Sequence, residues 1–137
     1  RPDPLIDPDA TGACLDALVA SGKVRAVGVS NFRPWDMDLL QSRMTARLAT
    51  NQIELSLMAH EALVNGDLAH LHRHRIAPMA WSPLAGGRMA AEAPAPLRAR
   101  MTALGLETGT DWSAVAVAWL LHHPAGILPV LGTNDVA

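Results

Sequence analysis

Lys-Val-Arg-Ala-Val-Gly-Val-Ser-Asn-Phe, residues 23–32, is the stretch that decides the fold. Its valines favour an extended strand over 24–29, directly after a turn signal. Ser30 and Asn31 follow where this strand should end, and Pro34 opens a new helical pattern. Hydroxyl and amide side chains donate and accept hydrogen bonds without carrying charge. Because α/β proteins commonly bind ligands at the carboxyl ends of strands, we predict a ligand contact here.

Composition limits the class of protein. Half of the 137 residues are hydrophobic, which suits one domain, or part of one, with a sizeable core. No apolar run approaches ~18 residues, so we expect no membrane span. With a net charge of −2 and no basic cluster apart from the mixed His/Arg segment at 70–75, we expect no nucleic-acid partner. Cys14 is the only cysteine, which excludes an internal disulfide and fits a cytoplasmic location. Because the sequence starts at Arg1 without Met, we expect a piece of a longer protein.

Strand and helix patterns alternate along the chain. We expect strands at 24–29, 49–55, 77–82 and 127–131. We expect helices after Asp7, after Pro34, from 68 to about 75, along 97–104 with Gly105 ending or weakening it, and at 112–122. A short Ala/Pro linker is expected at 93–96. The alternation predicts parallel β/α units. A doubly wound sheet is the competing fold, but no Gly-x-Gly-x-x-Gly follows any strand. We therefore favour a partial β/α barrel of about four units.

Polar or glycine-rich residues follow each predicted strand. The pairs are Ser30/Asn31, Gln52/Glu54, Trp81/Ser82 and Gly132/Thr133. In a β/α barrel these strand ends together form the active face. The alternation of residues 52–55 leaves two possibilities open, because its polar face could line a barrel interior or simply contact solvent.

A group of three histidines, His70, His72 and His74, lies in the third predicted helix. Their spacing places only His70 and His74 on one helical face. A metal site would need further ligands, and the sequence offers no carboxylate or cysteine at a fitting distance. We therefore expect a solvated basic face and predict no metal site.

Five motifs occur in an order and spacing that resemble the aldo-keto reductase family. They are Gly28-Val29-Ser30-Asn31-Phe32, Asn51-Gln52-Ile53-Glu54, Trp81-Ser82-Pro83-Leu84-Ala85-Gly86-Gly87, Ala118-Trp119-Leu120-Leu121 and Pro129-Val130-Leu131-Gly132-Thr133. The resemblance implies a parallel (β/α)8 TIM barrel. Residues 1–137 would form the C-terminal half of the reductase barrel domain, with strands five to eight.

This resemblance also implies an activity. The intact protein would be an oxidoreductase that reduces aldehydes or ketones to alcohols by hydride transfer from NAD(P)H, usually NADPH. Ser30, Asn31 and Gln52 would hold the carboxamide of the nicotinamide, and Trp81 would stack on the nicotinamide ring.

Residues from two other motifs would contact the rest of the cofactor. The pyrophosphate path would be lined by Ser82, Leu84 and the backbone of Ala85 and Gly86. The adenosine phosphate end would be approached by Gly132, Thr133 and Asn134. Many relatives place a lysine near this last motif to hold the 2′-phosphate, whereas Lys23 is the only lysine here. The choice of NADP over NAD therefore rests on family prevalence alone.

The family's proton donor is a tyrosine, assisted by lysine, aspartate and histidine from the first half of the barrel. This sequence contains no tyrosine. We therefore assign no catalytic residue to this chain and expect it to be inactive alone. Two alternatives are a non-catalytic cofactor-binding module that self-associates through open sheet edges, and a small metal-binding protein built on the histidines, which their spacing disfavours.

Overall fold

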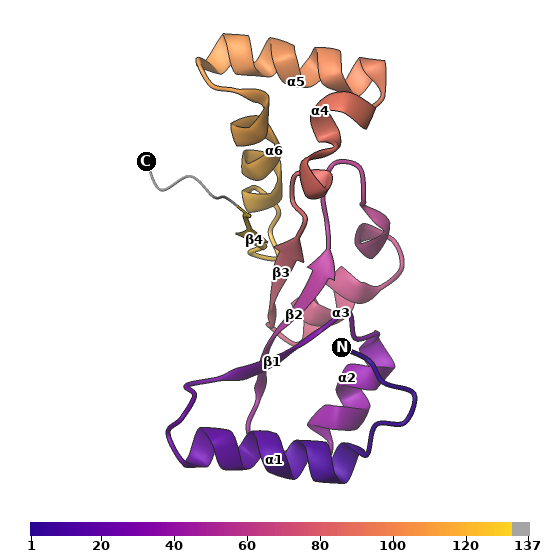
Figure 1. Ribbon diagram of the computed structural model, residues 1–137, viewed down its shortest axis with the longest axis vertical. Helices are drawn as coiled ribbons and strands as arrows, with labels where there is room; N and C mark the ends of the chain where they lie inside the picture. The colour runs from indigo at the N-terminus through magenta and orange to yellow at the C-terminus, as the bar shows by residue number, and fades with distance from the viewer. Residues whose placement is uncertain (133–137) are drawn as a thin grey trace.

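A computed structural model describes residues 1–132. Its centre is a four-stranded sheet in the order β1-β2-β3-β4, in which every strand pairs in parallel with the next (Figure 1). The strands are β1 (Val27–Ser30), β2 (Leu48–Glu54), β3 (Ala77–Trp81) and β4 (Leu128–Val130). This arrangement confirms the predicted parallel α/β class.

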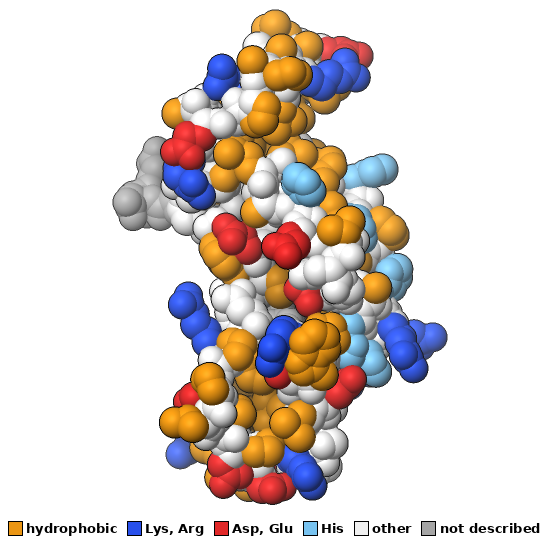
Figure 2. All heavy atoms as spheres, turned by 90° about the vertical axis from the view of Figure 1, so that its right-hand side faces the viewer, with side chains coloured by type: hydrophobic (Ala, Val, Ile, Leu, Met, Phe, Trp, Pro, Cys, Tyr) orange, Lys and Arg blue, Asp and Glu red, His pale blue; other side chains and the backbone are white. Residues whose placement is uncertain are grey.

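Helices follow the strands and also close both ends of an elongated molecule (Figure 1 and Figure 2). They are α1 (Pro8–Ala20), α2 (Pro34–Gln41), α3 (Asp67–Arg73), α4 (Met89–Glu92), α5 (Ala95–Thr108) and α6 (Trp112–Leu121). Two 3₁₀ turns, η1 (Glu61–Leu63) and η2 (Ala85–Gly87), were not predicted. No helix within residues 1–132 has the length and apolar character needed to cross a membrane.

Three local expectations were wrong. β1 begins at Val27, so residues 24–26 stay outside the sheet. The linker expected at 93–96 is shorter than predicted, because α4 ends at Glu92 and α5 starts at Ala95, which leaves only residues 93 and 94 between the two helices. Gly105 does not end α5. A Cβ at Gly105 would lie 2.8 Å from the carbonyl oxygen of Thr110, so glycine here allows the α5–α6 connection to pass close to the helix. The helix ends instead at Gly109, whose φ of 69° is left-handed.

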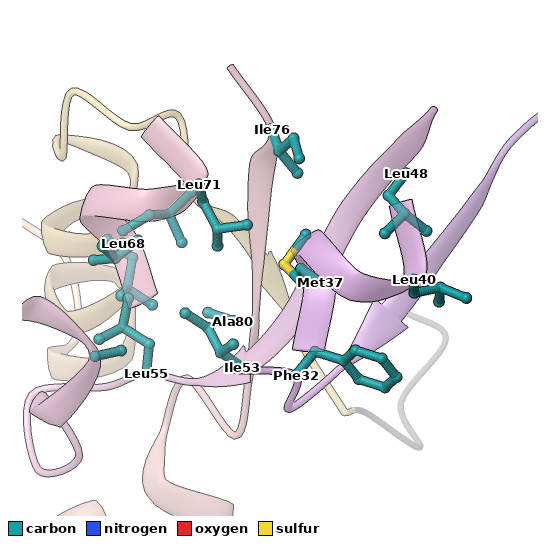
Figure 3. Close-up of a cluster of buried hydrophobic side chains, with 13 residues drawn as sticks. Phe32, Met37, Leu40, Leu48, Ile53, Leu55, Leu68, Leu71, Ile76 and Ala80 are labelled. Atoms are coloured by element: carbon teal, nitrogen blue, oxygen red, sulfur yellow. The ribbon is translucent and has the colours of Figure 1, made fainter. Parts of the chain in front are cut away.

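The hydrophobic core lies between one face of the sheet and the helices α2, α3 and α6 (Figure 3). Alternate strand residues such as Ile53 and Ala80 are buried on this face, with Leu71 and Met37 packed against them from the helices. On the opposite face, Gln52 and its register partner Met79 are only half-buried. The period of two therefore gives the sheet one apolar face and one accessible face with polar side chains.

Asn51 connects β2 to the loop after β1. Its side chain is 1% exposed and lies on the core face. The Asn51 Nδ2 donates to the carbonyl oxygen of Phe32 at 2.7 Å, and its Oδ1 accepts from the Phe32 N–H at 3.3 Å. One amide thus satisfies both main-chain polar groups of a buried loop residue. These two hydrogen bonds fix the path of the chain immediately after Asn31.

Asp16 connects α1 to the loop that enters β2. Its two carboxylate oxygens accept the main-chain N–H groups of Thr45 and Ala46 at 2.8 and 2.7 Å. These hydrogen bonds hold the pKa of the Asp16 carboxyl below its ordinary value. One turn earlier, a Cβ on Gly12 would lie 2.5 Å from the carbonyl oxygen of Arg43. The absence of a side chain there allows this face of α1 to approach the loop.

We expect Asn51→Ala to lower the free energy of unfolding by about 2–3 kcal/mol, because it leaves the buried N–H and C=O groups of Phe32 without partners. Urea unfolding followed by circular dichroism measures the change. Asn65→Ala is the matched control, since the side chain of Asn65 makes exposed hydrogen bonds with Asp67. Equal stability of the two variants would contradict the role given to Asn51.

We also expect Asp16 to contribute a pH-dependent part of the stability. A carboxyl whose pKa is lowered by folding stabilises the native state above its unfolded pKa, and this contribution is lost as the pH falls through the folded pKa. The difference in urea midpoint between the wild-type chain and Asp16→Asn should therefore be larger near pH ~6 than near pH ~3. A difference that stays constant between these pH values would show that the charge of Asp16 is not involved.

Candidate functional site

The carboxyl ends of the strands bring the predicted nicotinamide-binding residues together. Ser30 and Gln52 are register partners on adjacent strands, and Glu54 pairs in the same way with Trp81. Register partners in a parallel pair point to the same side of the sheet. Ser30 and Gln52 also line one depression of about 490 Å³ on the accessible face of the sheet. The sequence left open whether the polar face of β2 lines a barrel interior or only contacts solvent. In the structure this face lines a concave surface.

Asn31 lies at the junction of β1 and the following loop. Its main-chain N–H continues the sheet ladder by donating to the carbonyl oxygen of Gln52 at 2.9 Å. Its φ of 56° is left-handed, which asparagine tolerates better than most residues. The Asn31 Oδ1 accepts a hydrogen bond of 2.8 Å from the Trp81 Nε1. This bond orients both side chains.

A groove after β3 gathers the predicted phosphate-path residues. It has a volume of about 490 Å³, and its lining includes Ser82, Leu84, Gly86 and Gly132. Gly132 thus lies next to the turn after β3, although 50 residues of sequence separate it from Ser82. A Cβ at Gly132 would meet no atom within 4 Å, so the backbone is accessible there. Thr133 and Asn134 lie outside the described residues.

Ala85 differs from its neighbours in this turn. Its side chain is 3% exposed and packs into a second hydrophobic cluster with Met89 and Met101. Only the main chain of Ala85 could therefore face a ligand. Ser82 and Ala85 have left-handed φ values of 49° and 53°, an unfavourable conformation for residues with a Cβ. Together with Asn31, three of the four non-glycine residues that have this conformation within residues 1–132 are predicted cofactor contacts, which indicates strain concentrated at the candidate site.

A cavity of about 660 Å³ at the ends of β2 and β3 is the feature that the sequence analysis missed. Asn31 and Trp81 form one wall, and the loop from β2 to α3 forms another with His60 and Glu61. Arg33 also lines it. Its guanidinium bonds to Asp36 at 2.7 Å and holds the pKa of that carboxyl below its ordinary value. Nothing in the local sequence of this loop marks it as a cavity wall.

The chemistry of this surface suits a flat, uncharged polar group beside an anion. Ser30, Asn31 and Gln52 offer donors and acceptors with no charge, which match a carboxamide. Trp81 presents an aromatic ring that its hydrogen bond to Asn31 holds in place. The groove from Ser82 to Gly132 offers small residues and accessible backbone, which suit a phosphate chain.

The chain is similar to known proteins along almost its whole length. The chain is 62% identical over 136 residues to 6-dehydroglucose reductase of Agrobacterium fabrum, covering 99% of this chain and 46% of that protein. It is 39% identical over 140 residues to 6-dehydroglucose reductase of Novosphingobium aromaticivorans, covering 100% of this chain and 46% of that protein. The chain thus spans about half the length of these curated relatives.

Solved structures show the same arrangement of strands. The aldo/keto reductase from Klebsiella pneumoniae, solved in complex with NADP and acetate, matches with a TM-score of 0.82 at 27% identity. The match covers 94% of this chain and 45% of that one. The four parallel strands therefore correspond to about half of a TIM barrel of this kind. The family model for aldo/keto reductases matches residues 1–137, and the chain belongs to the aldo/keto reductase family.

Proposed function

We propose that this chain provides the cofactor-binding half of an NADPH-dependent reductase that converts aldehydes or ketones to alcohols. The observation that carries the proposal is the hydrogen bond between Trp81 and Asn31 beside the paired Ser30 and Gln52. It places an aromatic ring and a set of uncharged hydrogen-bonding groups at one edge of the sheet. A nicotinamide has the two complementary parts, a planar ring and a carboxamide.

Each group of residues has one task in this proposal. The side chains of Ser30, Asn31 and Gln52 bind the carboxamide and so select the face of the ring that points away from the sheet. Trp81 stacks on the nicotinamide ring and excludes water from the ring face that it covers. The bound cofactor supplies the hydride. The proposed phosphate contacts along the groove are Ser82, Leu84, Gly86 and Gly132, together with the main chain of Ala85. Thr133 and Asn134, which lie outside the described residues, are proposed contacts from their motif alone.

NADP is the proposed cofactor because a solved relative binds it. NAD is the alternative, since no lysine follows β4 in this sequence. For the intact protein we propose 6-dehydroglucose as a carbonyl substrate, on the basis of the reductases that match along the whole chain. The cavity beside Trp81 would form part of the surface that such a substrate meets.

We expect NADPH to quench the tryptophan fluorescence of the purified chain in a saturable way. Trp81→Ala should weaken binding about tenfold, because it removes both the stacking surface and the bond to Asn31, together worth about 1–2 kcal/mol. Trp81→Phe keeps an aromatic ring but loses the Nε1 donor, so its affinity for NADPH should lie between those of the wild type and Trp81→Ala. Titration with NADH in parallel measures the preference for the 2′-phosphate.

Trp119→Phe is the matched control, since Trp119 lies on α6 and lines none of the depressions described above. It should keep the wild-type dissociation constant. If Trp81→Ala bound NADPH as tightly as Trp119→Phe, the proposed stacking role would be wrong. Circular dichroism of each variant excludes loss of the fold as the cause of weaker binding.

The chain alone should consume no NADPH in the presence of an aldehyde, because the sequence offers no tyrosine as proton donor. The measurement is the absorbance of NADPH over time with the same sample that binds the cofactor. Steady consumption that is abolished by Trp81→Ala would show that another group donates the proton.

Static light scattering of this sample also reports self-association. This is the alternative favoured by strands β1 and β4, each of which has one partner strand within residues 1–132.

A further inference from the structure

A cluster of metal-ligating side chains lies outside the proposed cofactor site, between α2 and α3. It consists of Asp38, His70 and His74, and each residue offers one ligand atom within 4.8 Å of the other two. The cluster borders a depression of about 480 Å³ that shares no lining residue with the cofactor groove or the cavity beside Trp81. Figure 2 shows histidine side chains gathered on this side of the molecule, with acidic and basic groups nearby.

The fold supplies the carboxylate that the sequence spacing did not reveal. The N–H of His74 donates to the carbonyl oxygen of His70 at 3.1 Å, so one helical turn separates the two imidazoles. Their ring centroids lie 4.5 Å apart. Asp38 comes from α2, which packs beside α3. Its Oδ1 lies 3.4 Å from the Nε2 of His70 and 4.0 Å from the Nε2 of His74.

These distances are close to those of a tetrahedral centre. With metal–ligand bonds of about 2.0–2.1 Å, two ligand atoms of a tetrahedral zinc site are separated by about 3.3–3.4 Å. The contact between Asp38 and His70 already has this spacing, and the contact between Asp38 and His74 is about 0.6 Å longer. The open depression leaves space for water as the fourth ligand.

Other groups around the depression are already engaged. The Gln41 amide bonds to the backbone of Ala46 and Leu48, and the Ser42 hydroxyl bonds to the carbonyl oxygen of Leu39. The Arg47 guanidinium donates to the carbonyl oxygen of His74 and brings positive charge to the rim. One carboxylate beside that charge is a poor site for calcium or magnesium, which require several oxygen ligands. Two imidazoles and a carboxylate instead suit zinc and similar divalent transition metals.

We propose that Asp38, His70 and His74 bind a divalent transition metal of the zinc class, which links α2 to α3 on the outer surface of the sheet. The site is structural, because it shares no residue with the cofactor groove. A metal that binds only the folded state stabilises it, and this stabilisation rises with the logarithm of the free metal concentration once that concentration exceeds the dissociation constant.

Isothermal titration of the untagged, chelator-treated chain with zinc chloride tests the proposal. We expect one zinc ion per chain. Asp38→Ala and His74→Ala should each weaken binding more than about tenfold, because losing a ligand costs at least as much as losing an outer-shell partner. His72→Ala is the matched control, since this histidine is exposed on the same helix and outside the cluster. It should bind zinc like the wild type.

Equal zinc affinity of His72→Ala and His74→Ala would overturn the proposal, because it would show non-specific binding to surface histidines. The absence of zinc binding by the wild type would also overturn it. Asp38 and His74 are 63% and 43% exposed, so their substitutions should leave the fold intact, which circular dichroism checks. As a second readout, zinc should raise the melting temperature of the wild type and of His72→Ala but not of His74→Ala. None of these measurements uses NADPH, so the two proposals fail independently.

Discussion

The double hydrogen bond between the Asn51 amide and the main chain of Phe32 is the constraint on which the site depends. It joins a buried position of β2 to the loop after β1 and satisfies polar groups that water cannot reach. With Phe32 fixed, Asn31 is held in its left-handed conformation and points its amide toward Trp81. The strain at Asn31 therefore persists because the surrounding bonds determine the backbone on both sides of it.

The two faces of the sheet differ in burial and in the kind of side chain that they carry. The core face is covered by α2, α3 and α6 and holds the apolar cluster shown in Figure 3. On the accessible face, Ser30, Gln52 and Trp81 are only half-buried, so they remain available to a ligand. A complete barrel of the family closes around this second face, and this chain spans about half the length of its relatives. The single-partner edges at β1 and β4 are consistent with that relation.

Much of the fold followed from local patterns. Asp7 caps α1 and Asp111 caps α6, because a short polar side chain before a helix accepts its first free N–H groups. The four strands lie within about three residues of their predicted limits. Errors arose where a glycine served packing, as at Gly105, or where a turn such as η2 depends on contacts with distant residues. For the candidate site, the motifs pointed to residues at the strand ends, and the cavity wall at His60 and Glu61 appeared only in the structure.

The sequence by itself determined the order of the elements, the polar ends of the strands and the family, because these depend on side-chain periodicity and on motifs within short stretches. Only the tertiary structure decided which distant residues meet. The bond between Asn31 and Trp81 joins positions 50 residues apart, and the approach of Asp38 to His70 depends on how α2 packs against α3. Such contacts are set by sheet register and helix packing, which involve the whole chain at once and leave no local signal in the sequence.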